Sequence, residues 1–159
     1  MTVGSSRITQ AMRDAIGVTS GPCTHEVEKG DVICYARATG ETDPLFLDEV
    51  AARRTRYGGI VAPPTYLIVM RPMLAGRLKL ASPYPKSLDG GTRWRYLEPI
   101  RPGDRITATA RLAELYERDG RLGTMLFQVI EIEYSNQHGQ RVVAQRDTHI
   151  RYGTQEAGG

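Results

Sequence analysis

The second half of the chain constrains the fold most strongly, because it is a succession of strand-like segments separated by tight turns. Four segments alternate between polar and apolar residues, which is the period of a half-buried strand: 92–97, 106–116, 122–134 and 142–152. Residues 99–104 contain two prolines and a glycine, and Asp119-Gly120 and His138-Gly139 are typical of hairpin loops. The sequence therefore predicts four antiparallel strands in this half of the chain.

Residues 64–76 are apolar on nearly every side of a helix, which is typical of a helix buried on most of its faces. Pro64 suits the first helical position, and we expect Pro72 to kink or shorten the helix. Shorter elements precede it, with helices at 6–16, 32–39 and 48–56 and a strand at 22–28. Together they predict an α+β domain in which an antiparallel sheet wraps around one central apolar helix.

A chain of 159 residues corresponds to a single domain. We expect residues 1–19 to form an extension with a short helix, 20–152 the folded domain, and 153–159 a flexible tail. The net charge of +3 is spread along the chain, without the basic stripe and interleaved aromatic residues that nucleic-acid binding requires. No window approaches the ~20 apolar residues of a membrane span.

Cys23 and Cys34 are too few for a disulfide framework, and their spacing fits no zinc site. Reduced, packed thiols are typical of proteins in a reducing compartment. We therefore expect a cytoplasmic protein without a metal.

Residues 35–67, YARATGETDPLFLDEVAARRTRYGGIVAPPTYL, are the most informative about function. This segment resembles the active-site segment of the MaoC-like hydratase/dehydratase family, whose members add or remove water across the α,β bond of acyl thioesters. Five residues agree with the family pattern: Thr39, Gly40, Pro44, Leu45 and Asp48. The strand half resembles the family's N-terminal, FAS1-like dehydratase type, so the resemblance covers about residues 20–152. It implies a single hot-dog domain.

The positions that carry the family's chemistry hold other residues in this chain. The catalytic Asp of the pattern falls on Glu41, its Asn on Asp43 and its catalytic His on Phe46. The later His-Gly pair falls on Pro63 and Pro64. Phenylalanine cannot titrate, and proline has no backbone N–H to hold a thioester oxygen. Because the loss of one oxyanion donor typically costs ~3 kcal/mol of transition-state stabilisation, we expect this half-site to be inactive.

Three groups of residues are candidates for the site, each with a structural alternative. Glu41 and Asp43 are the remaining candidate catalytic carboxylates; alternatively, Glu41 faces solvent and Asp43 caps the turn before Pro44. Six residues either bind an acyl group or form ordinary core: Phe46, Pro63, Pro64, Thr65, Tyr66 and Trp94. Three arginines either attract the phosphates of a coenzyme A or carrier-protein arm or form a solvated helix face: Arg53, Arg54 and Arg56.

The three histidines offer no familiar replacement for the missing catalytic one. His25 is expected to be structural, and His138 lies in a hairpin loop at the surface. His149 alternates with Asp147 and Arg151 along the last strand, which predicts an exposed or interface position.

The resemblance implies a subunit of a heteromeric (R)-type enoyl-thioester hydratase or 3-hydroxyacyl-thioester dehydratase. Pro-Pro-Thr in place of His-Gly resembles the non-catalytic member of a two-hot-dog assembly, in which a second MaoC-like subunit carries the intact Asp and His. The predicted role is acyl binding, with no cofactor beyond the coenzyme A or pantetheine of the substrate. Three alternatives stay open: a self-sufficient hydratase using Glu41 and Asp43, a hot-dog thioesterase, and a homodimeric acyl-CoA binding module.

Overall fold

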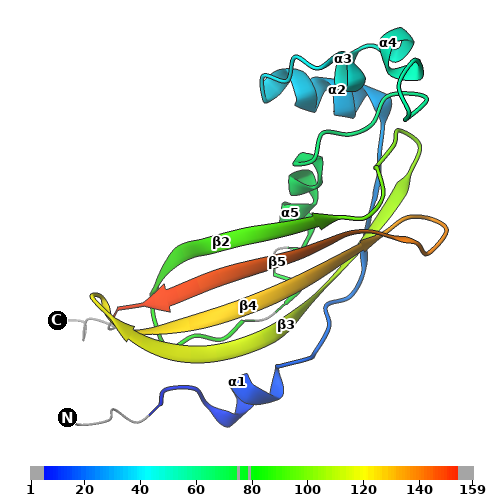
Figure 1. Ribbon diagram of the computed structural model, residues 1–159. Coiled ribbons are helices and arrows are strands. Elements are labelled where there is room, and N and C mark those ends of the chain that lie inside the picture. Colours follow the sequence, from blue (N-terminus) through cyan, green and yellow to red (C-terminus); the bar gives the residue numbers. More distant parts are fainter. Residues whose placement is uncertain (1–5, 75, 79, 154–159) are drawn as a thin grey trace.

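Five antiparallel strands form one curved sheet in the order β1-β3-β4-β5-β2 (Figure 1). The computed structural model describes residues 6–74, 76–78 and 80–153. Its strands are β1 (Cys23–Glu26), β2 (Lys86–Tyr96), β3 (Arg105–Gly120), β4 (Gly123–Ser135) and β5 (Arg141–Tyr152). The β3-β4-β5 meander has the two hairpins that the sequence predicts, but the first turn is at residues 121–122 and not at Asp119-Gly120, which still pair with β4. The α+β prediction with an antiparallel sheet is confirmed.

Strand β2 is longer than the predicted segment 92–97 and begins at Lys86. Its register against β5 shifts between Asp89 and Thr92, so Gly90 and Gly91 form a bulge. A Cβ atom on Gly90 would lie 2.8 Å from Cγ2 of Thr148, and Gly91 has a φ of 104°. The bulge therefore needs both glycines, which the sequence pattern alone indicates as a strand break.

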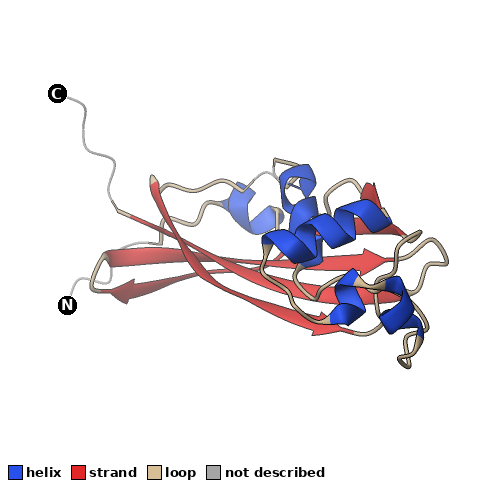
Figure 2. Cartoon of the chain, turned by 90° about the horizontal axis from the view of Figure 1, so that it is seen from above, coloured by secondary structure: helices blue, strands red, loops and turns tan. Residues whose placement is uncertain are grey.

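The helices are short and lie on one face of the sheet and beyond its end (Figure 2). They are α1 (Gln10–Asp14), α2 (Lys29–Ala38), α3 (Pro44–Leu47), α4 (Glu49–Arg53), the 3₁₀ helix η1 (Tyr66–Met70) and α5 (Arg71–Leu74). Among the described residues, no helix is long and apolar enough to cross a membrane.

The apolar segment 64–76 does not form one regular helix, in line with the kink or shortening expected at Pro72. The segment is divided into η1 and α5, which meet between Met70 and Arg71. Pro72 cannot donate a backbone hydrogen bond to the preceding turn, so a regular α-helix cannot pass through it. It lies instead in the first turn of α5, where no such donor is needed.

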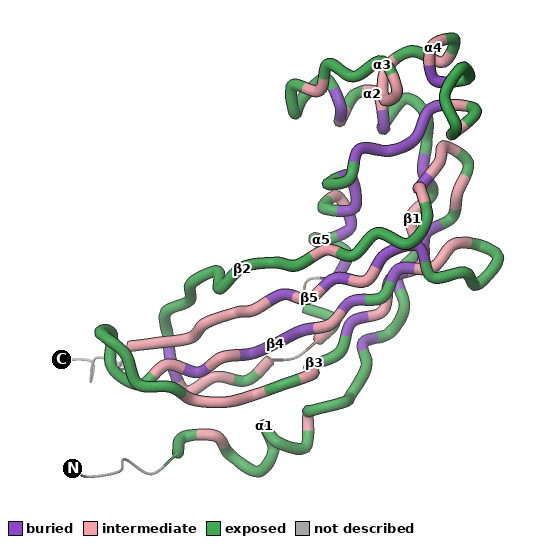
Figure 3. Tube along the Cα trace, viewed as in Figure 1, coloured by how far each residue is buried: buried purple, intermediate pink, exposed green. Residues whose placement is uncertain are grey.

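The core lies between these two helices and the sheet face that they cover (Figure 3). Tyr66, Leu67 and Met70 of η1 are at most 1% exposed, as are Ile106 and Ala108 of β3. The burial of successive residues alternates along β3 and β5, which confirms that one face of each strand packs inward.

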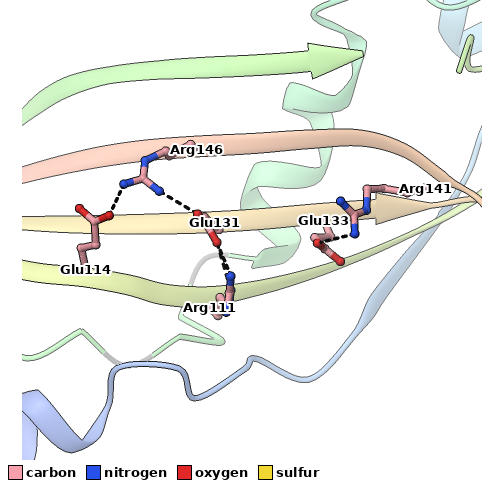
Figure 4. Close-up of polar contacts among 6 residues, drawn as sticks. All are labelled: Arg111, Glu114, Glu131, Glu133, Arg141 and Arg146. Atoms are coloured by element: carbon pink, nitrogen blue, oxygen red, sulfur yellow. Dashed lines mark hydrogen bonds and ion pairs between the residues drawn. The ribbon is translucent and has the colours of Figure 1, made fainter. Parts of the chain in front are cut away.

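The opposite face of the sheet carries ion pairs that run across three strands (Figure 4). Arg111, Glu131 and Arg146 are direct cross-strand partners on β3, β4 and β5. Glu131 accepts from both arginines, and the second guanidinium nitrogen of Arg146 lies 2.6 Å from Glu114. Exposed pairs of this kind contribute little stability each. These ion pairs make the outer face of the sheet polar, whereas the inner face packs against the helices.

Candidate functional site

A cavity of about 520 Å³ lies where the segment after α4 meets the end of β2. Phe46, Pro63 and Pro64 line it, so three of the six predicted acyl-binding residues share one wall. Arg56, one of the three predicted phosphate-binding arginines, lines it as well. The structure thus brings together residues from both predicted groups.

Two contacts hold the wall of this cavity in place. The hydroxyl of Tyr96, at the end of β2, donates to the carbonyl oxygen of Pro64 at 2.7 Å. The backbone N–H of Ala62 donates to the carbonyl oxygen of Ile100 at 2.8 Å. These contacts attach the proline segment to the sheet. Burial, with a smaller effect of Tyr35, raises the pKa of Tyr96, which keeps its hydroxyl protonated and able to donate.

The two predicted catalytic carboxylates do not line the cavity. Asp43 is exposed and caps α3, because its Oδ1 accepts from the backbone N–H of Leu45 at 2.8 Å. This cap fixes the start of the helix that presents Phe46 to the cavity. Glu41 is half-buried in the loop between α2 and α3. Catalysis by either residue stays a prediction.

Glu98 is a carboxylate in the cavity wall that the sequence analysis did not select. It is exposed and lies two residues after the end of β2, just before the turn at residues 99–104. In the sequence, only its position directly after the predicted strand 92–97 could have indicated a role for Glu98. Charged residues before turns are common at protein surfaces, so this position alone does not indicate a site.

The other predicted acyl-binding residues are not among those that line the cavity. Tyr66 is 1% exposed, its hydroxyl lies 3.1 Å from Nε2 of His25, and burial raises its pKa to about 12. The hydroxyl of Tyr35 donates to Oγ1 of Thr65 at 2.9 Å. His25 therefore has the structural contact that was expected of it. Direct substrate binding by Thr65 and Tyr66 stays a prediction.

Trp94 is half-buried and packs between two tyrosines. Its ring is stacked on Tyr96 and on Tyr134, with centroid distances of 6.2 and 6.1 Å. It is not among the residues that line the cavity, but it supports Tyr96, which does line it.

The three arginines of the predicted phosphate site have different surroundings. Arg53 is paired with Glu49 at 3.0 Å, and Glu49 also binds Lys29 at 2.9 Å. Arg54 is exposed. Arg56 lies with its guanidinium carbon 4.9 Å from the ring centroid of Tyr57. Arg53 already shares a carboxylate with Lys29, and of the three arginines Arg56 is the one that lines the cavity, where its positive charge faces any bound ligand.

The exposed or interface position predicted for His149 rested on its alternation with Asp147 and Arg151, and the structure does not place His149 fully in solvent. Asp147 is only 4% exposed, and His149 is half-buried. Burial, more than any nearby charge, lowers the pKa of His149. The alternation correctly placed both residues on one face of β5, but that face is the inner one.

A family model for the FAS1-like, dehydratase domain region matches residues 14–145. A UPF0336 protein of Streptomyces griseus is 30% identical over 102 residues, which cover 61% of this chain and 68% of that protein.

Two solved complexes from Mycobacterium tuberculosis contain chains of similar structure. The ChsH1–ChsH2 complex gives a TM-score of 0.78 at 18% identity, covering 92% of this chain and 99% of that one. The C-terminally truncated HadBC complex, a 3R-hydroxyacyl-ACP dehydratase, gives 0.73 at 22% identity, covering 86% and 97%. These similarities confirm the hot-dog fold. With the family match spanning most of its length, the chain belongs to the MaoC-like family and contains its FAS1-like dehydratase domain region.

Proposed function

We propose that this chain is the non-catalytic, acyl-binding subunit of a heteromeric (R)-type enoyl-thioester hydratase or 3-hydroxyacyl-thioester dehydratase. One observation carries the proposal: Phe46 and Pro64 line the same cavity. They occupy the positions of the family's proton-transferring His and of its oxyanion-binding Gly. A phenyl ring cannot move a proton and a proline nitrogen cannot donate a hydrogen bond, so the cavity lacks both contributions to catalysis.

The cavity still has the properties of a binding site for an acyl group. Its volume of about 520 Å³ lies within the ~300–1,000 Å³ that is usual for small-molecule sites. Its wall is largely apolar, with Leu45, Val61 and Pro63 among the lining residues. Arg56 adds one positive charge for a phosphate of coenzyme A or of a carrier-protein arm. The cavity therefore supports binding without supporting turnover.

Strand β2 supports a partnership with a second hot-dog subunit. It is an edge of the sheet, and ten of its eleven residues are exposed, Trp94 being the half-buried one. A long exposed edge strand favours pairing with another chain. Both cysteines are free thiols, which supports a cytoplasmic location.

The test is hydration of crotonyl-CoA and of a longer enoyl-CoA, followed by loss of the enoyl absorbance. The purified chain is assayed alone and after co-expression with a MaoC-like protein of the same organism that retains the Asp and His. We expect no turnover by the chain alone, co-purification of the two proteins, and turnover by the complex. Turnover by the chain alone would overturn the proposal.

The variants that distinguish a self-sufficient enzyme are Glu41→Gln, Asp43→Asn and Glu98→Gln. If the chain alone turns over and one of them abolishes that activity, the affected carboxylate is catalytic. In the complex, we expect all three variants to retain most of the activity, because the partner carries the proton-transferring residues.

A further inference from the structure

A second cavity, of about 380 Å³, lies between α5 and the inner face of β3, β4 and β5. Most of its wall is apolar and comes from Leu74, Leu78 and Leu80 on one side and from Ala110, Ile130 and Ile132 on the sheet. Arg71, Asp147 and His149 also line it. An apolar cavity with a few convergent polar groups is typical of a small-molecule site.

Asp147 is held in position by a chain of buried hydrogen bonds. The hydroxyl of Tyr134 donates to Oε1 of Gln145 at 2.6 Å, and Nε2 of Gln145 donates to Oδ1 of Asp147 at 2.7 Å. Tyr134, Gln145 and Asp147 are all at most 4% exposed. The other carboxylate oxygen, Oδ2, lies 3.9 Å from the guanidinium of Arg71. That separation is longer than a hydrogen bond, so Oδ2 can accept a hydrogen bond from a ligand in the cavity.

His149 and Arg71 complete the polar part of the wall. His149 is two residues from Asp147 on the same face of β5, and no hydrogen bond joins its ring to any of the residues that the structure describes. A neutral imidazole has one donor and one acceptor nitrogen, whereas Arg71 can only donate. Together with the carboxylate of Asp147, the wall presents both kinds of hydrogen-bonding group.

These groups select for a neutral head group. His149 feels the positive charges of Arg71 and Arg151 and the negative charges of Asp147 and Asp89, so charges of both signs surround it. A carboxylate would pair with Arg71 but also meet Asp147, and an ammonium would pair with Asp147 but also meet Arg71, so either meets a like charge in a largely apolar space, which is unfavourable. A ketone could accept from Arg71 but would offer no donor to Asp147. A hydroxyl group can donate to Oδ2 of Asp147 and accept from Arg71 or His149.

We propose that this cavity binds an apolar chain that carries a hydroxyl group, recognised by Asp147, Arg71 and His149. That the physiological ligand is an acyl chain hydroxylated away from its thioester rests on the proposed function of the subunit. The recognition of a hydroxylated apolar ligand does not rest on that function, because the residues that line the cavity all belong to this protein and need no partner.

The test compares two probes with the same chain, 1-octanol and 1-methoxyoctane, which lacks the donor. Binding to the purified chain is measured by titration calorimetry and by the fluorescence of Trp94, the single tryptophan. We expect 1-octanol to bind at least about tenfold more tightly, because a site built for a donor rejects the ligand that leaves its acceptor unpaired. Equal affinities for the two probes would overturn the proposal.

Variants of the polar wall locate this preference. In His149→Leu and Arg71→Leu, we expect the preference for the alcohol to fall to about threefold or less, with binding of the ether unchanged. His138→Leu and Arg93→Leu are the matched controls, since His138 is exposed in a loop and Arg93 is exposed on β2, away from the lining residues. Persistence of the full preference in both wall variants would refute the assignment.

A filling variant tests the cavity itself. Ala110→Leu adds volume to the cavity wall, and we expect it to weaken both probes. If it does not fold, the two wall variants still decide the question. No catalytic partner is present in these titrations, so a failure of the proposed hydratase function would leave their result unchanged.

Discussion

Replacement of Tyr134 by Phe tests the buried relay from Tyr134 through Gln145 to Asp147. The variant keeps the aromatic ring but leaves Oε1 of Gln145 without the donor that lies 2.6 Å away. An unpaired buried acceptor costs ~1–3 kcal/mol, so we expect the free energy of unfolding to fall by ~2 kcal/mol. With a urea m-value of ~2 kcal/mol/M, the unfolding midpoint moves down by ~1 M.

The control for this variant is Tyr116→Phe. Tyr116 stacks on Phe127 on the opposite face of the sheet, and its hydroxyl has no hydrogen bond to a described residue. We expect this change to cost less than ~0.5 kcal/mol. Urea unfolding followed by circular dichroism measures both variants. Equal midpoint shifts for the two tyrosines would refute the reasoning.

A second background makes the test of the relay sharper. In Gln145→Leu, the acceptor of Tyr134 is gone, and the tyrosine hydroxyl is itself an unpaired buried donor. Tyr134→Phe should then be neutral or stabilising in that background. The same loss of stability in both backgrounds would show that Tyr134 contributes through packing and not through the hydrogen bond.

Three further outcomes are expected. Burial lowers the pKa of His149 below its usual 6.5, so just below that pH the unfolded chain binds more protons than the folded one. The free energy of unfolding should therefore decrease as the pH falls through 6.5 and level off below the pKa of the folded state. Urea unfolding at pH 7.5 and 5 should show a smaller decrease in His149→Gln. Phe46→His alone should give no hydration of crotonyl-CoA, because Pro64 still offers no N–H; substantial turnover would contradict our account of the cavity. Leu88 and Leu97 are 44% and 40% exposed, on the edge strand and just beyond its end. Lysine at both positions should abolish co-elution with the catalytic partner in size-exclusion chromatography while leaving the free energy of unfolding within ~0.5 kcal/mol of the parent; co-elution of the double variant would contradict a β2 interface.

The hairpins were predictable because their turns are specified locally. His138-Gly139 lies where the structure connects β4 to β5, but Asp119 and Gly120 still pair with β4, so the first turn is at residues 121–122, two residues later than predicted. The division of the apolar segment at Pro72 could be predicted only as a kink. The start of β2 was missed because Gly90 and Gly91 form a bulge, and glycine in a sequence indicates a strand end as often as a bulge.

The candidate site was predictable where its residues are close in sequence. Phe46, Pro63 and Pro64 come from one motif, and they line one cavity. Asp147 and His149 were placed on a common strand face, but alternation cannot say which face meets the core. Which face of β5 points inward is decided by where α5 packs against the sheet, and this tertiary contact cannot be read from the alternation.

The strand order has a consequence for how the sheet is assembled. Strands β3, β4 and β5 pair through hairpins, and such local contacts form quickly. Strand β2 pairs with β5 across the whole intervening meander, so its pairing closes a long loop and carries a larger entropic cost. We therefore expect the meander to form first and β2 to join it late. Strand β1 closes a longer loop still, so both edge strands are expected to be less protected in hydrogen exchange than the meander, and β2, the edge that we propose for the partner, gains most protection when the partner binds.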